Sequence, residues 1–169
     1  AAEVAADLGV TCAGSIEDLL SRVDAAVVAS NTVTHHEVTM KALAAGRHTL
    51  VEKPIASDSM QAAELESEAS RLGLVLAVGH VERFNPAVVA AGAVIDSPMF
   101  VEAHRLAPFK PRGIDVSVVM DLMIHDIDLV LSFVRAPVSE VHASGVAVLT
   151  DTIDIASARV LFANGAVAN

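Results

Sequence analysis

The stretch DAAVVASNTVTHHEVTMKALAAGRHTLVEKP, residues 24–54, decides the fold because it contains a strand, a helix and a second strand in succession. Residues 24–30 are a short continuous apolar run, which is typical of a strand buried in a parallel sheet. Thr34, with a glutamate three positions later, predicts the start of a helix that ends at Gly46. Residues 48–52 predict the second strand. Two strands joined by a helix of this length indicate a βαβ unit.

The residues around this stretch repeat the alternation of helix and strand. They predict short helices over 1–8 and 15–22, a long helix from Ser57 or Asp58 to Gly73, and a strand over 74–79. This first half is therefore expected to form a parallel sheet covered by helices.

The pattern changes after Gly79, where longer strand-like segments replace the alternation. The sequence first predicts a helix that begins at Asn85–Pro86, a strand within 99–107 and a loop over 110–115. It then predicts a buried helix over 118–134, two strands within 139–150 and 153–162, and a hairpin turn at Asn164–Gly165. The predicted fold class is α/β, with a partial parallel-sheet domain over 1–82 and a partial α+β domain with a mostly antiparallel sheet over 83–169. Both ends of the chain fall inside predicted elements, so we expect an internal fragment.

Composition narrows the class of protein. The 53% hydrophobic content supplies core material, and the net charge of −10 argues against a nucleic-acid or anionic-membrane surface, although a small anionic ligand stays compatible. Cys12 is the single cysteine, which fits a reducing cytoplasm. The sequence has no signal-peptide pattern and no apolar run of the roughly 18 residues that a membrane span needs. We expect a cytoplasmic protein.

The helix over 118–134 carries one titratable stripe on an apolar background. At about 100° per residue, Asp121, His125, Asp128 and Ser132 share one face. A buried row of carboxylates and imidazole needs partners. Three interpretations remain open from the pattern alone: a satisfied core network, general-base chemistry, or a metal site formed by the i,i+4 pair.

Polar residues follow two predicted strands, at the ends where open α/β sheets bind ligands. Ser30 and Asn31 follow the first strand, and Glu52 and Lys53 end the second, just before a proline. An ammonium group positioned there stabilises negative charge on a substrate oxygen, but a solvated lysine in a turn explains it equally well. For His35, at a helix start, structural, cofactor-facing and metal-binding roles compete.

Several of these motifs together resemble the Gfo/Idh/MocA family of NAD(P)-dependent sugar and polyol dehydrogenases. The resemblance is carried by His35, ALAAGRHTLVEKP (42–54), Gly79 followed by Arg83–Phe84, and Asp121-x-x-x-His125-x-x-Asp128. It implies a Rossmann domain, a second domain with an open, mostly antiparallel sheet, and an active site between the two.

The same resemblance implies roles for individual residues. Lys53 is expected to be the catalytic lysine, with Asp121 and His125 as the acid–base pair. NAD or NADP is the implied cofactor, lined by Ser30, Asn31, His35, Glu52 and, as a weaker candidate, His80. Arg105 and Arg112 are candidates for holding a phosphate-bearing substrate. No metal is expected, and strands over 139–169 are expected to form a homo-oligomer.

Within the family, three segments of this sequence most resemble the members that oxidise the 3-hydroxyl of UDP-N-acetylglucosamine. These segments are GHVERFNPA (79–87), MDLMIHDID (120–128) and DIASARVLFANGAVAN (154–169). The chain lacks the G-x-G-x-x-G segment with which the family begins, so alone it is expected to bind a dinucleotide poorly. Two other classes stay open: a non-catalytic sugar-nucleotide-binding or regulatory protein, and a metal-dependent hydrolase using Asp121 and His125.

Overall fold

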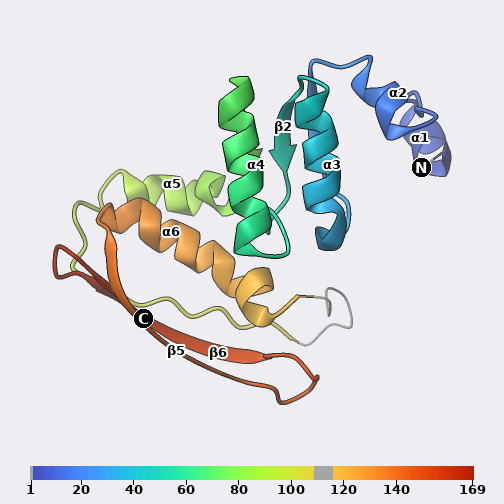
Figure 1. Ribbon diagram of the computed structural model, residues 1–169. Helices are drawn as coiled ribbons and strands as arrows, with labels where there is room; N and C mark the ends of the chain where they lie inside the picture. Colours follow the sequence, from blue (N-terminus) through green and yellow to red (C-terminus); the bar gives the residue numbers. More distant parts are fainter. Residues whose placement is uncertain (1, 109–115) are drawn as a thin grey trace. The chain divides into compact units, whose positions relative to one another are not determined.

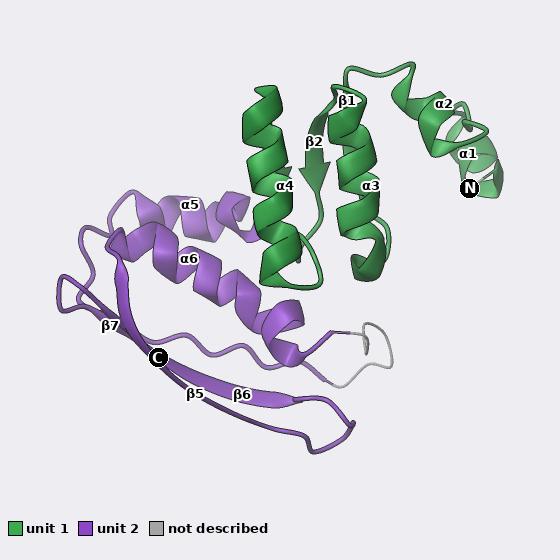
Figure 2. Cartoon of the chain, viewed as in Figure 1, with its two compact units in different colours: residues 1–79 green, residues 80–169 purple. Residues whose placement is uncertain are grey.

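The computed structural model describes residues 2–108 and 116–169, which belong to two compact units, 1–79 and 80–169 (Figure 2). Each unit has its own sheet and its own small core. Within the described residues, no helix is both long enough and apolar enough to cross a bilayer.

The first unit is a parallel sheet with helices between its strands (Figure 1). Its elements are α1 (Ala2–Leu8), α2 (Ile16–Leu20), β1 (Ala25–Val28), α3 (Thr32–Ala44), β2 (His48–Val51), α4 (Ser59–Leu72) and β3 (Leu76–Val78). The strands lie in the order β1-β2-β3, and both neighbouring pairs are parallel. The parallel sheet predicted from the alternating pattern is therefore confirmed.

The ends of the helices follow their capping residues. The Asp58 carboxylate accepts a hydrogen bond from the Gln61 amide at 2.9 Å and so begins α4, and Gly73, at φ 65°, ends it as predicted. The predicted capping residue of α3 was wrong by three positions, since Asn31 and not Thr34 occupies the N-cap and the helix begins at Thr32. The Thr34 hydroxyl instead donates hydrogen bonds to the Ser30 hydroxyl and the Asn31 carbonyl oxygen in the preceding turn.

Helices α3 and α4 pack on one another and bury the core of this unit. Leu43 of α3 and Leu65 of α4 are fully buried at its centre. The strand over 24–30 was expected to be buried in the sheet, but its alternate side chains differ: Val28 is 3% exposed, whereas Val27 is 70% exposed. The expectation that this strand is buried on both faces was therefore wrong for the face that carries Val27.

The second unit contains a mixed sheet and one main helix. Its elements are the 3₁₀ helix η1 (Val81–Phe84), α5 (Pro86–Gly92), β4 (Phe100–Val101), the π-helical turn η2 (Val119–Met123), α6 (Ile124–Val134), β5 (Val138–Val146), β6 (Ile155–Phe162) and β7 (Val167–Ala168). The order is β4-β7-β6-β5, with β5/β6 and β6/β7 antiparallel and β4/β7 parallel. The predicted mostly antiparallel sheet is confirmed.

Local signals account for most of the boundaries in this unit. The Asn85 side chain accepts from the Ala87 amide at 3.0 Å, which begins α5 as predicted. Gly165, at φ 86°, forms the tight turn between β6 and β7. The strand predicted within 99–107 is shorter than expected, because only Phe100 and Val101 pair with β7. The predicted loop over 110–115 lies outside the described residues.

The helix predicted over 118–134 exists, but it differs from the prediction in two ways. It opens with the π-helical turn η2, and regular α-helix begins only at Ile124. It was also expected to be buried around most of its circumference. Val134 packs into the core of the unit beside Phe162, yet Ile127 and Leu131 are 38% and 44% exposed, so burial is confined to part of the helix.

Candidate functional site

The carboxyl ends of the three parallel strands are aligned by backbone hydrogen bonds. The Glu52 amide donates to the Val28 carbonyl at 2.9 Å, and the Gly79 amide donates to the Val51 carbonyl at 2.8 Å. Residues that directly follow these strands therefore gather along one edge of the sheet, which is where open α/β sheets bind ligands. Four of the predicted cofactor-lining residues, Ser30, Asn31, His35 and Glu52, belong to this edge or to the helix start beside it.

His35 fastens two of the loops at this edge. Its side chain is 1% exposed, with Nδ1 2.8 Å from the Pro54 carbonyl oxygen and Nε2 3.0 Å from the Ser30 carbonyl oxygen. Both partners are acceptors, so the ring donates to both only in its doubly protonated form. The structure thus gives His35 a role in holding the Ser30 and Pro54 loops together, and direct contact with a cofactor stays a prediction.

Glu52 and Gly79 lie in close contact next to the predicted catalytic lysine. The Lys53 amide donates to Glu52 Oε2 at 3.3 Å, and the Lys53–Pro54 peptide bond is cis. A Cβ atom added to Gly79 would lie 2.9 Å from Glu52 Oε2 and 3.3 Å from Glu52 Cα. Gly79 is therefore the residue that gives the glutamate room, a function that the sequence analysis did not assign to it.

The strand-end edge of the sheet carries polar groups of the kind that a dinucleotide needs. It offers the Ser30 hydroxyl, the Glu52 carboxylate and the Asn31 amide, which sits at the N-cap of α3 without making a side-chain capping bond. Hydroxyl, amide and carboxylate groups match the ribose hydroxyls and carboxamide of a nicotinamide nucleotide. The residues present fit that end of the cofactor.

The titratable stripe of α6 finds its partner within the second unit. Asp128 is 8% exposed, and its carboxylate accepts from Arg83 Nε and Nη2, each at 2.6 Å. The hydrogen bond to Asp128 raises the pKa of the Arg83 guanidinium above its usual value. His80, predicted to line the cofactor, lies with Nδ1 3.9 Å from Asp128 Oδ1. Arg83 was part of the family motif, but sequence reasoning gave it no role.

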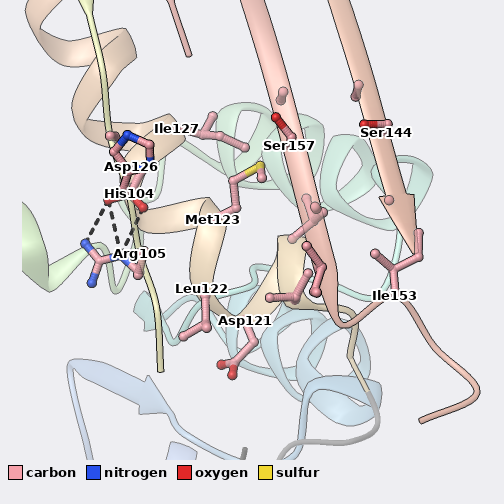
Figure 3. Close-up of a pocket in the computed structure, with 18 of the residues that line it drawn as sticks. His104, Arg105, Asp121, Leu122, Met123, Asp126, Ile127, Ser144, Ile153 and Ser157 are labelled. Atoms are coloured by element: carbon pink, nitrogen blue, oxygen red, sulfur yellow. Dashed lines mark hydrogen bonds and ion pairs between the residues drawn. The ribbon is translucent and has the colours of Figure 1, made fainter. Parts of the chain in front are cut away.

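A hollow of about 1320 Å³ lies between η2–α6 and the β5–β6 sheet (Figure 3). Its walls are mostly apolar, and its polar lining includes Asp121 and, apart from it, the group of His104, Arg105 and Asp126 (Figure 3). Arg105 Nη2 donates to Asp126 Oδ1 at 2.8 Å, and this bond raises the pKa of Arg105. Asp121 of the titratable stripe therefore lines the hollow, whereas His125 is not among its lining residues.

The predicted substrate-binding arginines have different outcomes. Arg105 is described, and it already bonds to a carboxylate, so its binding of a substrate phosphate stays a prediction. Arg112 lies outside the described residues. Among residues 2–108 and 116–169, no group of three or more His, Cys, Asp or Glu side chains is placed to hold a metal ion.

The architecture defines a class: a nucleotide-binding α/β unit followed by a unit with a mixed, mostly antiparallel sheet. Residues 1–80 match the model of an oxidoreductase family with an NAD-binding Rossmann fold, and residues 82–169 match the GFO/IDH/MocA C-terminal domain. The chain therefore belongs to the GFO/IDH/MocA family of oxidoreductases.

Individual relatives agree with this assignment. The chain is 46% identical over 170 aligned residues to UDP-N-acetylglucosamine 3-dehydrogenase of Acidithiobacillus ferrooxidans, covering 100% of the chain and 54% of that protein. A solved structure of that enzyme superposes with a TM-score of 0.93, covering 100% of this chain and 56% of the other. Inositol 2-dehydrogenase of Rubrobacter xylanophilus is 34% identical over 132 residues, 73% of this chain and 38% of that protein. The chain thus spans about half the length, or less, of these curated relatives.

Proposed function

We propose that the protein is an NAD(P)-dependent dehydrogenase that oxidises the 3-hydroxyl of UDP-N-acetylglucosamine. The observation that carries the proposal is the 46% identity to an enzyme of that name along the whole chain. Support comes from the family motifs, since Lys53 follows the second strand of the parallel sheet and Asp121 and His125 lie on the η2–α6 helix.

The proposed chemistry assigns one task to each side chain. His125 accepts the proton of the substrate hydroxyl, because an imidazole titrates near neutral pH without a large perturbation. Asp121 orients the imidazole and favours its protonated form. Lys53 donates a hydrogen bond to the same substrate oxygen and offsets its developing negative charge. NAD or NADP, when bound, would accept the hydride from the carbinol carbon of the substrate.

The binding roles follow from the chemistry of the strand-end residues. Ser30, Asn31 and Glu52 offer hydrogen bonds to the nicotinamide ribose, and His35 keeps their loops in place. Arg105 and Arg112 are proposed to meet the diphosphate of the substrate. A cytoplasmic homo-oligomer formed through the β5–β6 sheet, with no nucleic-acid or membrane partner, completes the proposal.

The decisive experiment is a panel of UDP-sugars assayed with the full-length protein. Reduction of NAD or NADP is followed by absorbance, with UDP-N-acetylglucosamine, UDP-N-acetylgalactosamine, UDP-glucose and myo-inositol compared at equal concentrations. We expect turnover with UDP-N-acetylglucosamine to exceed that with each other compound by at least ~10-fold in kcat/KM. Nucleotide binding without reduction of the cofactor would indicate a non-catalytic binding protein. Activity that EDTA abolishes would favour a metal-dependent enzyme instead.

A further inference from the structure

Helix α6 is held unevenly around its circumference. On one side Val134 packs with Phe162 and Ala168 in the core of the second unit, and Val130 packs against the same core. On the side that borders the hollow, Ile127 and Leu131, one turn apart, stay 38% and 44% exposed. Apolar packing among the described residues therefore holds one side of α6 and leaves the other uncovered, which restrains rotation about the helix axis only weakly.

A second attachment is found on the stripe itself. Arg83 reaches α6 from η1, and its Nε and Nη2 atoms donate to the two oxygens of Asp128, each at 2.6 Å. Two parallel bonds between a planar guanidinium and a planar carboxylate fix orientation as well as distance. Rotation of α6 about its axis would break at least one of them. The pair therefore restrains the rotation that one-sided apolar packing leaves possible.

We propose that Arg83 and Asp128 are positioning residues for the reaction: their bidentate pair sets the rotation of α6 and thereby the direction of the His125 imidazole. His125 lies three residues before Asp128, so the two side chains project from neighbouring positions on the same face. A small rotation at Asp128 consequently displaces the base from the substrate hydroxyl. This inference rests on the proposed function, since it names how the base of that reaction is aimed.

The surroundings of Asp128 leave the restraint to Arg83. His80 Nδ1 is 3.9 Å from Asp128 Oδ1, which exceeds hydrogen-bond distance. Asp128 is 8% exposed, so water is a poor substitute for a lost partner. The Arg83 side chain, by contrast, is 50% exposed and can be exchanged with little change in packing. Arg83 is therefore the better place to perturb the pair.

The test uses Arg83→Lys and Asp128→Asn in the full-length protein. Lysine keeps the positive charge next to Asp128 but cannot form the two-pronged contact. We expect Arg83→Lys to lower kcat by ~10- to 100-fold, because misplacing a catalytic group by about 1 Å lowers the rate by a factor of that order. The KM for the sugar nucleotide and the KM for the cofactor should each stay within about threefold of wild type. We also expect hydrogen exchange of the amides over 120–128 to become at least ~10-fold faster.

A matched control is available on α4, where Arg71 Nε and Nη2 donate to the two Glu68 oxygens, each at 2.7 Å. This pair has the same geometry but is exposed, so Glu68→Gln should leave kcat and the exchange over 120–128 unchanged. Wild-type kcat in Arg83→Lys would overturn the proposal, and so would a lower kcat without faster exchange. If Asp128→Asn fails to fold, Arg83→Lys still decides. A wild-type protein without turnover contradicts the proposed function instead, and exchange then reports on the restraint alone.

Discussion

His125 is the residue on which the proposed chemistry depends most. A positioned general base contributes ~10²–10⁴ in rate, so His125→Ala should lower kcat of the full-length protein by at least ~100-fold. The measurement is steady-state cofactor reduction at saturating sugar nucleotide. Ser132→Ala is the control, because Ser132 lies on the same stripe and its hydroxyl donates to the Leu129 carbonyl of its own helix. Turnover like that of the wild type in His125→Ala would remove this residue from the role of base.

Single residues also show which contacts can be predicted from the sequence and which cannot. The requirement that a carboxylate on an apolar helix must have a partner was correct, and Asp128 has one. The identity of that partner, Arg83, was not predictable, because it lies 45 residues earlier and only the tertiary fold joins the two. His35 is similar: its place at a helix start was read correctly, but its bonds to the Ser30 and Pro54 carbonyls depend on the arrangement of two loops.

At the scale of elements, the β5–β6 hairpin depends on one carboxylate in its loop. Asp154 Oδ2 accepts from the backbone amides of Thr150, Val148 and Leu149 at 2.9, 2.8 and 2.7 Å. These bonds, led by that from Thr150, lower the pKa of Asp154 from 3.8 to about 2. A carboxylate bound in this way ties the loop between the two strands.

The lowered pKa predicts how the hairpin responds to acid. A pKa that is lower in the folded state stabilises the protein above the unfolded value near 4, and the benefit is lost as the pH falls toward about 2. Asp154→Asn should therefore be less stable than wild type at neutral pH, and the two should converge between about pH 4 and pH 2. Urea denaturation at several pH values measures this difference.

The neighbouring Asp151 supplies the control for that experiment, because it is exposed in the same loop. Asp151→Asn should stay close to wild type in its denaturation midpoint throughout. A difference between Asp154→Asn and wild type that keeps its size down to pH 2 would contradict the assignment of the pKa to this contact.

Element boundaries were predictable where a side chain caps the element. Helix α4 begins after Asp58 and ends at Gly73 as expected, and α5 begins after Asn85 as expected. Predictions were less accurate where tertiary pairing decides. The strand within 99–107 is limited to the two residues that β7 pairs with, and the π-helical turn at Val119–Met123 has no signal in the apolar periodicity.

At the scale of the whole molecule, the sheet of the second unit is expected to join copies of the protein. Arg159 and His142 are paired across β6 and β5 and do not line the hollow, so they belong to the outer face of the sheet. We expect an oligomer for the full-length protein in light scattering coupled to size-exclusion chromatography.

The variant that tests this surface carries His142→Glu together with Arg159→Glu. Like charges directly opposite one another are unfavourable across a sheet and at an interface, so the variant should shift toward the monomer. Glu68→Gln, on α4 of the other unit, should keep the wild-type mass. An unchanged mass in the double variant would place the contact elsewhere or exclude it.

The order of the two units and the type of each sheet were predictable, because they follow from periodicity and from the length of the connections. The coverage of the sheets was not. The run over residues 24–30 predicted a strand buried in the sheet, yet Val27 is 70% exposed, whereas its neighbour Val28 is 3% exposed. Periodicity within a strand reports how apolar its faces are, and it does not report what covers them.

The wide turn at Val119–Met123 gives the helix an unusual tolerance for a change in chain length. A π-helical turn accommodates roughly one residue more than a regular turn. Removing a single amino acid there should restore ordinary α-helix while the segments before and after it keep their faces, because the extra residue had been absorbed within the turn. The same one-codon deletion within Ile124–Val134, which is regular α-helix, would instead turn everything before it by about 100° relative to everything after it.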